Sequence, residues 1–206
     1  MTAAVLDRAR LAAAFDRGAG RPPAPTDDGR PLEPLDILQR LDRRTVRTPA
    51  LEVVNREVVR ALNTPDDRLI IVMPPQEGKS TTATRAGTLY ALRQNPTRRI
   101  VVASYAHNVA RRFGRLVRND ITSHQGRDGT WDCGLRIAAD QRAANEWELT
   151  TGGGVYAVGV GGALTSRPAD VLIIDDPLKG RKDADSQTIR DDVWDWWEST
   201  ASTRLS

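Results

Sequence analysis

The alternation of continuous apolar runs with segments of helical spacing constrains this chain most. The apolar runs are 69-LIIVM-73, 100-IVVAS-104 and 171-VLIID-175. Segments with apolar residues at helical spacing follow at 80–94, at 106–121 and from about 185 to 197. Strands that are apolar throughout are typical of parallel sheets buried on both faces. The pattern therefore predicts an α/β fold of three layers, with a mainly parallel central sheet flanked by helices.

The rest of the chain divides into an extension and one domain. Residues 1–20 have the composition of a short helix, and 19-AGRPPAPTDDGRP-31 is typical of a linker. We therefore expect a flexible extension over 1–33 and a single domain over 34–206. Further helices are predicted at 34–44 and at 49–62, the second one capped by Thr48, and short strands at 135–139, 146–149 and 154–159.

Composition narrows the cellular setting. The net charge is +3 and the sequence pI is about 9.4, which is compatible with a polyanionic partner. Cys133 is the single cysteine, so an internal disulfide and metal sites of the Cys-x-x-Cys type are excluded. No apolar run reaches membrane-spanning length, and Asp7, Arg8 and Arg10 interrupt the N-terminal segment, which argues against a secretory signal. We expect a cytoplasmic protein that does not enter membranes.

The stretch 72-VMPPQEGKSTT-82 follows the first apolar run and precedes a helix. A Gly-Lys-Ser tripeptide in this setting is typical of a phosphate-binding loop, in which Lys79 reaches the β- and γ-phosphates and Ser80 binds Mg²⁺. The glycine usual at the start of such a loop is replaced by Met73, so an ordinary turn with Ser80 as a helix cap remains open from this motif alone. The predicted nucleotide-binding residues are Pro75, Gln76, Glu77, Gly78, Lys79, Ser80 and Thr81.

A pair of acids supports the phosphate-loop interpretation. The run 171-VLIIDD-176 ends in Asp175 and Asp176, at the carboxyl end of a strand, where α/β proteins bind ligands. Phosphoryl transfer to water needs one carboxylate for Mg²⁺, here Asp175, and one group that orients and deprotonates the water, here Asp176. The separation between Lys79 and Asp175 leaves room for further strands, which favours an ATPase of the motor (ASCE) type among P-loop NTPases.

Several motifs in order give the chain a family resemblance. The segments 73-MPPQEGKST-81, 103-ASYAHNVARRFGRLVRN-119, 152–180 and 203-TRL-205 resemble the large terminase subunit of tailed bacteriophages, over residues 45–206. The resemblance implies an ATPase that uses ATP and Mg²⁺ to drive viral DNA into a procapsid, in the cytoplasm of a host cell. The partners it implies are double-stranded DNA, the portal of the procapsid, the small terminase subunit and further copies of the chain in a ring.

Three departures from the family pattern matter. The second acid, often glutamate in the family, is Asp176 here. The arginine that many members carry inside the loop is replaced by Gln76 and Glu77, so an arginine finger has to come from elsewhere. Arg167, donated by a neighbouring subunit, is the predicted finger, with Arg111 and Arg112 as alternatives. No acid cluster of the family's nuclease domain is found, so we expect no nuclease activity.

Smaller signals and other functions complete the prediction. The segment 199-STASTRL-205 resembles the family's coupling motif, and the spacing of Trp194 and Trp197 predicts that both pack from one helix face. A helicase-like DNA translocase remains an alternative, although it would normally carry a second motor domain. A prophage remnant that binds nucleotide without turnover is the other alternative.

Overall fold

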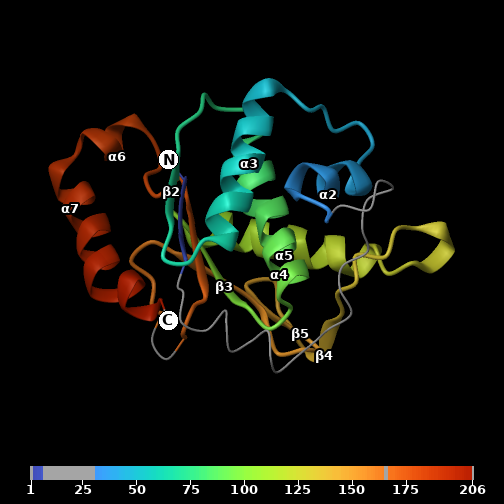
Figure 1. Ribbon diagram of the computed structural model, residues 1–206. Helices are drawn as coiled ribbons and strands as arrows, with labels where there is room; N and C mark the ends of the chain where they lie inside the picture. Colours follow the sequence, from blue (N-terminus) through green and yellow to red (C-terminus); the bar gives the residue numbers. More distant parts are fainter. Residues whose placement is uncertain (1, 7–30, 165–166, 206) are drawn as a thin grey trace.

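The computed structural model describes residues 2–6, 31–164 and 167–205 (Figure 1). Its sheet is flanked by helices, so the protein is α/β as predicted. None of the helices in these ranges combines the length and apolar character needed to cross a bilayer. The strands are β1 (Thr2–Leu6), β2 (Arg68–Ile71), β3 (Arg99–Ser104), β4 (Ile137–Arg142), β5 (Glu146–Leu149), β6 (Gly154–Gly159) and β7 (Val171–Asp175). The helices are α2 (Pro34–Leu41), α3 (Pro49–Asn63), η1 (Thr81–Ala86), α4 (Gly87–Gln94), α5 (His107–Ser123), η2 (Arg127–Gly129), α6 (Arg181–Asp185), α7 (Gln187–Trp196), η3 (Trp197–Ala201) and η4 (Ser202–Arg204).

The sheet has the order β2-β1-β7-β3-β6-β5-β4 and is mixed. Only β3 pairs in parallel with β6 and β7, whereas the other four pairings are antiparallel. The prediction of a mainly parallel sheet is therefore wrong. Residues 143–145 and 150–153 are the links in the β4-β5-β6 series. Links this short join antiparallel strands, because a parallel connection needs a dozen or more residues.

Strand β1 differs from the helix that the sequence predicts for residues 1–20. Thr2–Leu6 lie between β2 and β7 and pair with both, with Thr2 opposite Ile71 on one side and Asp175 on the other. This pairing gives hydrogen-bond partners to backbone groups of β2 and β7. Local propensity does not predict such a strand, because the pairing depends on residues far along the chain. Residues 7–20 lie outside the described part of the chain. The boundary of the domain at residue 34 stays a prediction, and α2 begins there.

Alternate residues of the central strands enter two separate cores. Ile100, Val102 and Ile173 pack with α3, α4 and α5 on one face. Val101, Leu172 and their neighbours pack with the C-terminal helices on the other. This alternation explains why β3 and β7 read as continuous apolar runs, since neither face meets water. The sheet is thus the middle layer, and Figure 1 shows α3 and α7 on its two sides.

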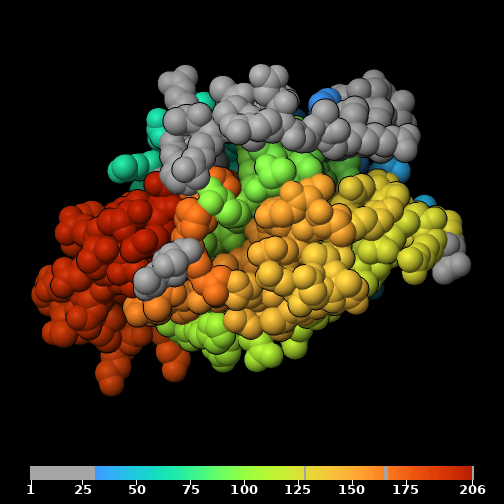
Figure 2. All heavy atoms as spheres, turned by 90° about the horizontal axis from the view of Figure 1, so that it is seen from below, coloured from blue at the N-terminus to red at the C-terminus, as the bar shows by residue number. Residues whose placement is uncertain are grey.

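The C-terminal helices cover the second face of the sheet and form one end of the molecule (Figure 2). Trp196 is the buried anchor: it is 6% exposed, and its indole Nε1 donates to the carbonyl of Gly162 at 3.0 Å. Trp197 is partly buried against the same core, whereas Trp194 is 58% exposed. The prediction that Trp194 and Trp197 pack from one face is wrong for Trp194, because the helix turns the neighbouring Trp196 toward the sheet.

We expect Gly154→Ala to lower the free energy of unfolding by about 2–3 kcal/mol or more, because a Cβ there would overlap the Trp147 carbonyl of β5. Gly180→Ala is the control, since a Cβ at Gly180 meets no atom of the described residues within 4 Å. Its effect should stay within about 0.5 kcal/mol. Urea denaturation measures both values, and similar stabilities of the two variants would contradict the close approach of β5 and β6.

Candidate functional site

The loop between β2 and η1 contains two residues in left-handed backbone conformations. Gln76 and Gly78 have φ values of 68° and 84°, in the left-handed region. Gly78 tolerates this conformation without a steric cost, whereas Gln76 adopts it as a non-glycine residue. Lys79 and Ser80 then begin the helix, and the Thr82 amide donates to the Gly78 carbonyl at 2.9 Å. The loop is therefore a tight turn that points the first helical residues toward the end of β7.

The two acids at the end of β7 differ in burial and backbone conformation. Asp175 is the last residue of the strand, and its side chain is 2% exposed. Asp176 has a φ of 49°, and its side chain is 52% exposed. A left-handed non-glycine residue directly after a buried strand is a strained position of the kind found at functional sites. One acid is thus fixed in the interior, and the other faces a wetter environment.

Loop and acids meet at one place. The Lys79 ammonium donates to Asp176 Oδ1 at 2.6 Å and lies 3.9 Å from Asp175 Oδ1. The Ser80 hydroxyl donates to Asp175 Oδ1 at 2.9 Å. These partners are 95 and 97 positions apart in the sequence. The four residues that the sequence singled out from two motifs therefore form one polar cluster.

Thr84 is a member of this cluster that the sequence analysis missed. Its hydroxyl donates to Asp175 Oδ2 at 3.1 Å, and the residue is fully buried. Thr84 lies four positions after Ser80, so both side chains face the same side of the helix. That spacing was the available signal. Together Ser80 and Thr84 bond both oxygens of the buried Asp175 carboxylate.

Thr84 also lies within η1, a π-helical turn inside the longer helix that continues as α4. The sequence predicts one helix over 80–94, and the structure confirms its extent but widens its first part. Insertions of this kind in α-helices are frequent at functional sites. Here the wider turn carries the residue that bonds Asp175.

Opposing effects set the charges of the pair formed by Lys79 and Asp176. Burial raises the pKa of the Asp176 carboxyl, but contacts with positive charge, the hydrogen bond from Lys79 first among them, lower the pKa overall. Burial lowers the pKa of the Lys79 ammonium, yet its contact with Asp176 outweighs this effect and raises the pKa. Both groups are consequently charged at neutral pH, and each stabilises the other.

Most of the other predicted loop residues are more exposed than Lys79 and Ser80. Pro75, Gln76, Glu77 and Thr81 are exposed, and Gly78 is half-buried. The loop residues that point outward are therefore accessible to a ligand, whereas Lys79 and Ser80 face the acids. Their roles toward a nucleotide stay a prediction.

Arg167, the predicted arginine finger, lies over β5 and β6 rather than beside the Lys79 cluster. Its guanidinium forms an ion pair with Glu146 and stacks 4.1 Å from the ring centre of Tyr156 on β6. In the sheet order, β3 separates β6 from β7, so two strand spacings of about 5 Å each separate Tyr156 from the strand of Asp175. The structure does not bring Arg167 to the cluster of its own chain. The alternatives Arg111 and Arg112 are exposed on α5.

The segment 199–205 packs beside the start of β7. The Ala169 amide donates to the Arg204 carbonyl at 2.8 Å, and Ala169 bridges to Leu205. The hydroxyls of Ser199 and Ser202 bond carbonyls of their own helix. The tail is thus tied to the end of β7 opposite Asp175, and its coupling role stays a prediction.

The cluster suits a metal ion only together with a ligand. In the described part of the chain, no group of three or more His, Cys, Asp or Glu residues is arranged to hold a metal. Ser80 and Asp175 nevertheless present two oxygen donors side by side. Mg²⁺ often takes one or two protein oxygens and completes its shell with phosphate oxygens and water. The donor set therefore fits Mg²⁺ that arrives with a phosphate, rather than a dedicated metal centre.

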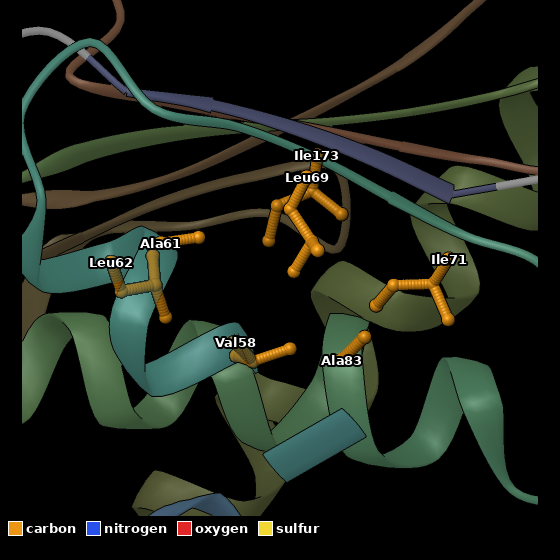
Figure 3. Close-up of a pocket in the computed structure, with 7 residues that line it drawn as sticks. All are labelled: Val58, Ala61, Leu62, Leu69, Ile71, Ala83 and Ile173. Carbon is orange, nitrogen blue, oxygen red and sulfur yellow. The ribbon is translucent and has the colours of Figure 1, made fainter. Parts of the chain in front are cut away.

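A small apolar cavity lies between α3, β2, η1 and β7 (Figure 3). It is lined by aliphatic side chains, among them Val58, Leu69 and Ile173, and Figure 3 shows these side chains pointing toward one another. No polar group from the Lys79 cluster enters it. The cavity is a packing gap under the sheet and offers no recognition chemistry for a nucleotide.

These features define an α/β protein with a mixed sheet, in which a glycine-lysine-serine loop faces two acids at a strand end. A comparison with protein families identifies the family of the chain. Residues 70–205 match the family described as "Terminase large subunit, T4likevirus-type, N-terminal". The chain belongs to this family, as the sequence resemblance predicted. Membership indicates a role in the packaging of phage DNA. Neither the curated proteins nor the solved structures contain a match.

We expect Lys79→Met to raise the pKa of the Asp176 carboxyl, because the variant removes the cation but keeps the effect of burial. Carboxyl ¹³C NMR titration of the wild type and the variant measures the change. Lys182→Met, at an exposed position on α6, is the matched control and should leave this titration unchanged. An unchanged Asp176 pKa in Lys79→Met would contradict the ion pair.

Proposed function

We propose that this chain is the ATP-hydrolysing motor domain of a phage terminase large subunit, with a P-loop NTPase fold, that powers translocation of viral DNA into procapsids. The observation that carries the proposal is the convergence of Lys79 and Ser80 with Asp175 and Asp176. Family membership supplies the biological setting. The proposed partners are double-stranded DNA, the portal of the procapsid, the small terminase subunit and other copies of the chain.

The ion pair between Lys79 and Asp176 suggests how nucleotide binding prepares the site. The lysine of a phosphate-binding loop contacts the β- and γ-phosphates, so a bound nucleotide competes with Asp176 for the ammonium. Once the phosphates take over this contact, the Asp176 carboxylate is released. A free carboxylate beside the γ-phosphate is then able to orient an attacking water and accept its proton.

Asp175 is arranged for a different task. Ser80 and Thr84 hold its two oxygens, and its side chain is only 2% exposed. A carboxylate fixed in this manner is suited to hold a metal ion together with Ser80. Mg²⁺, when bound there, would neutralise charge on the phosphate oxygens. The protein contributes the Ser80 hydroxyl oxygen and the Asp175 carboxylate, and Thr84 holds this carboxylate in place through Oδ2.

Lys79→Ala should reduce the rate of ATP hydrolysis by at least about 100-fold, because the main cation facing the phosphates is lost. Phosphate release with Mg²⁺ and ATP measures the rate, and Lys182→Ala is the control with an equal change of charge. Equal phosphate release from the wild type and Lys79→Ala would refute the proposal. A wild type that binds nucleotide but releases no phosphate would identify the nucleotide-binding remnant instead.

The proposed arginine finger can be tested by mixing subunits. Lys79→Ala lacks a working site but keeps Arg167, whereas Arg167→Ala keeps the site but lacks the arginine. If the arginine acts across an interface, each variant is inactive alone, and a random equimolar mixture has about one quarter productive interfaces, one half times one half. ATPase activity of the mixture should therefore recover toward about a quarter of the wild-type rate.

The control mixture contains Lys79→Ala with the double variant Lys79→Ala/Arg167→Ala, in which no interface is productive. The rate should also rise more than linearly with the concentration of the wild-type protein. A mixture without recovery, together with strictly linear scaling, would rule out donation of Arg167 in trans.

A further inference from the structure

Helix α5 presents a face of arginines whose charge is not neutralised by acids. Arg111, Arg112 and Arg115 are exposed, and Arg118 is half-buried. Among the described residues, no ion pair involves any of the four. Arg118 instead donates to the carbonyl of Arg142 at 2.6 Å and to Asn119. Positive charge therefore accumulates along one side of this helix.

The single acid on α5 does not offset this charge. Asp120 is buried on the inner side of the helix and forms a two-bond ion pair with Arg85, at 2.7 and 2.6 Å. Arg85 belongs to η1, so the negative charge of α5 is used inside the protein. The exposed residues of α5 therefore include three arginines and no acid.

Tight packing holds this face in place. The buried stripe of α5 contains Ala110, Gly114 and Val117 and rests on β3 and β6. The Trp147 indole donates to the Gly114 carbonyl at 2.9 Å, and a Cβ at Gly114 would lie 3.0 Å from the Ala144 carbonyl. The helix thus lies close against the sheet, on the same side as α3 and α4 (Figure 1). A rigid helix loses little freedom when its outer face binds a partner.

We propose that this arginine face, formed by Arg111, Arg112, Arg115 and Arg118, binds the sugar-phosphate backbone of duplex DNA. Arg111 and Arg118 are seven residues apart, so the face extends about 10 Å along the helix axis. B-DNA carries one phosphate per strand about every 3.4 Å of its axis, so a face of this length can reach about three phosphates. The inference rests on the proposed function, to which it adds the surface that meets the DNA.

The position of α5 connects this surface with the candidate site. The Tyr105 amide donates to the Asp176 carbonyl at 3.0 Å, and α5 begins two residues later at His107. Asp176 is also the partner of Lys79. Any movement of Asp176 when Lys79 exchanges partners therefore reaches the start of α5 through one backbone bond. A DNA contact on α5 lies one short connection away from the proposed hydrolysis site.

The test compares a triple variant with a matched control. Arg111→Gln/Arg112→Gln/Arg115→Gln removes three charges from the face, and Arg43→Gln/Arg56→Gln/Arg181→Gln removes three from exposed positions elsewhere. Fluorescence anisotropy with a labelled 30-base-pair duplex, repeated over a salt series, measures affinity. The slope of log K against log salt should fall in magnitude by about 2–3 in the first variant, with at least about a tenfold loss of affinity.

The control variant should stay within about twofold of the wild type. Equal affinities and slopes for the two triple variants would overturn the proposal. Circular dichroism shows whether the triple variant is folded. If it is not, the single exposed substitution Arg115→Glu provides a second test, and it should weaken duplex binding more than Arg181→Glu does. Wild-type binding of RNA or polyglutamate as tightly as the duplex would also overturn the assignment to duplex DNA.

Failure of the surface can be told apart from failure of the proposed function. Arg115→Gln/Arg118→Gln, which leaves Arg111 and Arg112 in place, should keep the basal ATPase rate measured without DNA, because neither residue touches the Lys79 cluster. A wild type without ATPase activity but with arginine-dependent duplex binding would sink the proposed motor and leave the surface standing. Normal ATPase activity together with duplex binding that does not depend on these arginines would refute the proposed surface and leave the proposed motor function standing.

Discussion

The buried carboxylate of Asp175 is the constraint around which the rest of the site is arranged. A charge removed from water is costly unless it is paired and hydrogen-bonded. Ser80 and Thr84 bond its two oxygens, and the Lys79 ammonium lies 3.9 Å away. All three partners come from the loop and helix after β2, whereas Asp175 ends β7. Stabilising one buried acid thus fixes the position of the loop against the strand.

Several features of the site follow from that attachment. With Asp175 held inside, the next residue turns sharply, and Asp176 takes a left-handed conformation with its side chain toward Lys79. Its carbonyl meanwhile accepts from Tyr105 at the end of β3. The ends of two strands and the start of a helix are therefore joined through two consecutive residues.

The sequence predicted those parts that depend on local pattern. Continuous apolar runs predicted β3 and β7, because both faces of these strands are buried, and two motifs predicted the residues that meet in the cluster. Strand β1 depends on pairing with strands far along the chain, so its five residues could not reveal it. Thr84 escaped notice because it belongs to neither motif, and only its spacing of four residues from Ser80 pointed to its contact with Asp175. The choice between Trp194 and Trp196 depended on a rotation of the helix that periodicity alone left open.

The environment of Arg167 bears on whether it can act in a neighbouring subunit. Within its own chain it lies over β6, two strands from Asp175, and it is held by Glu146. Both side chains of this ion pair remain about one third exposed, at 39% and 33%. Pairs this accessible to water contribute about 0–1 kcal/mol, and a cation–π contact such as the one with Tyr156 adds about 0.5–1 kcal/mol, so releasing the arginine costs about 2 kcal/mol at most. An arginine that is excluded from its own site by distance, yet only weakly retained, has the properties required of a group donated across an interface.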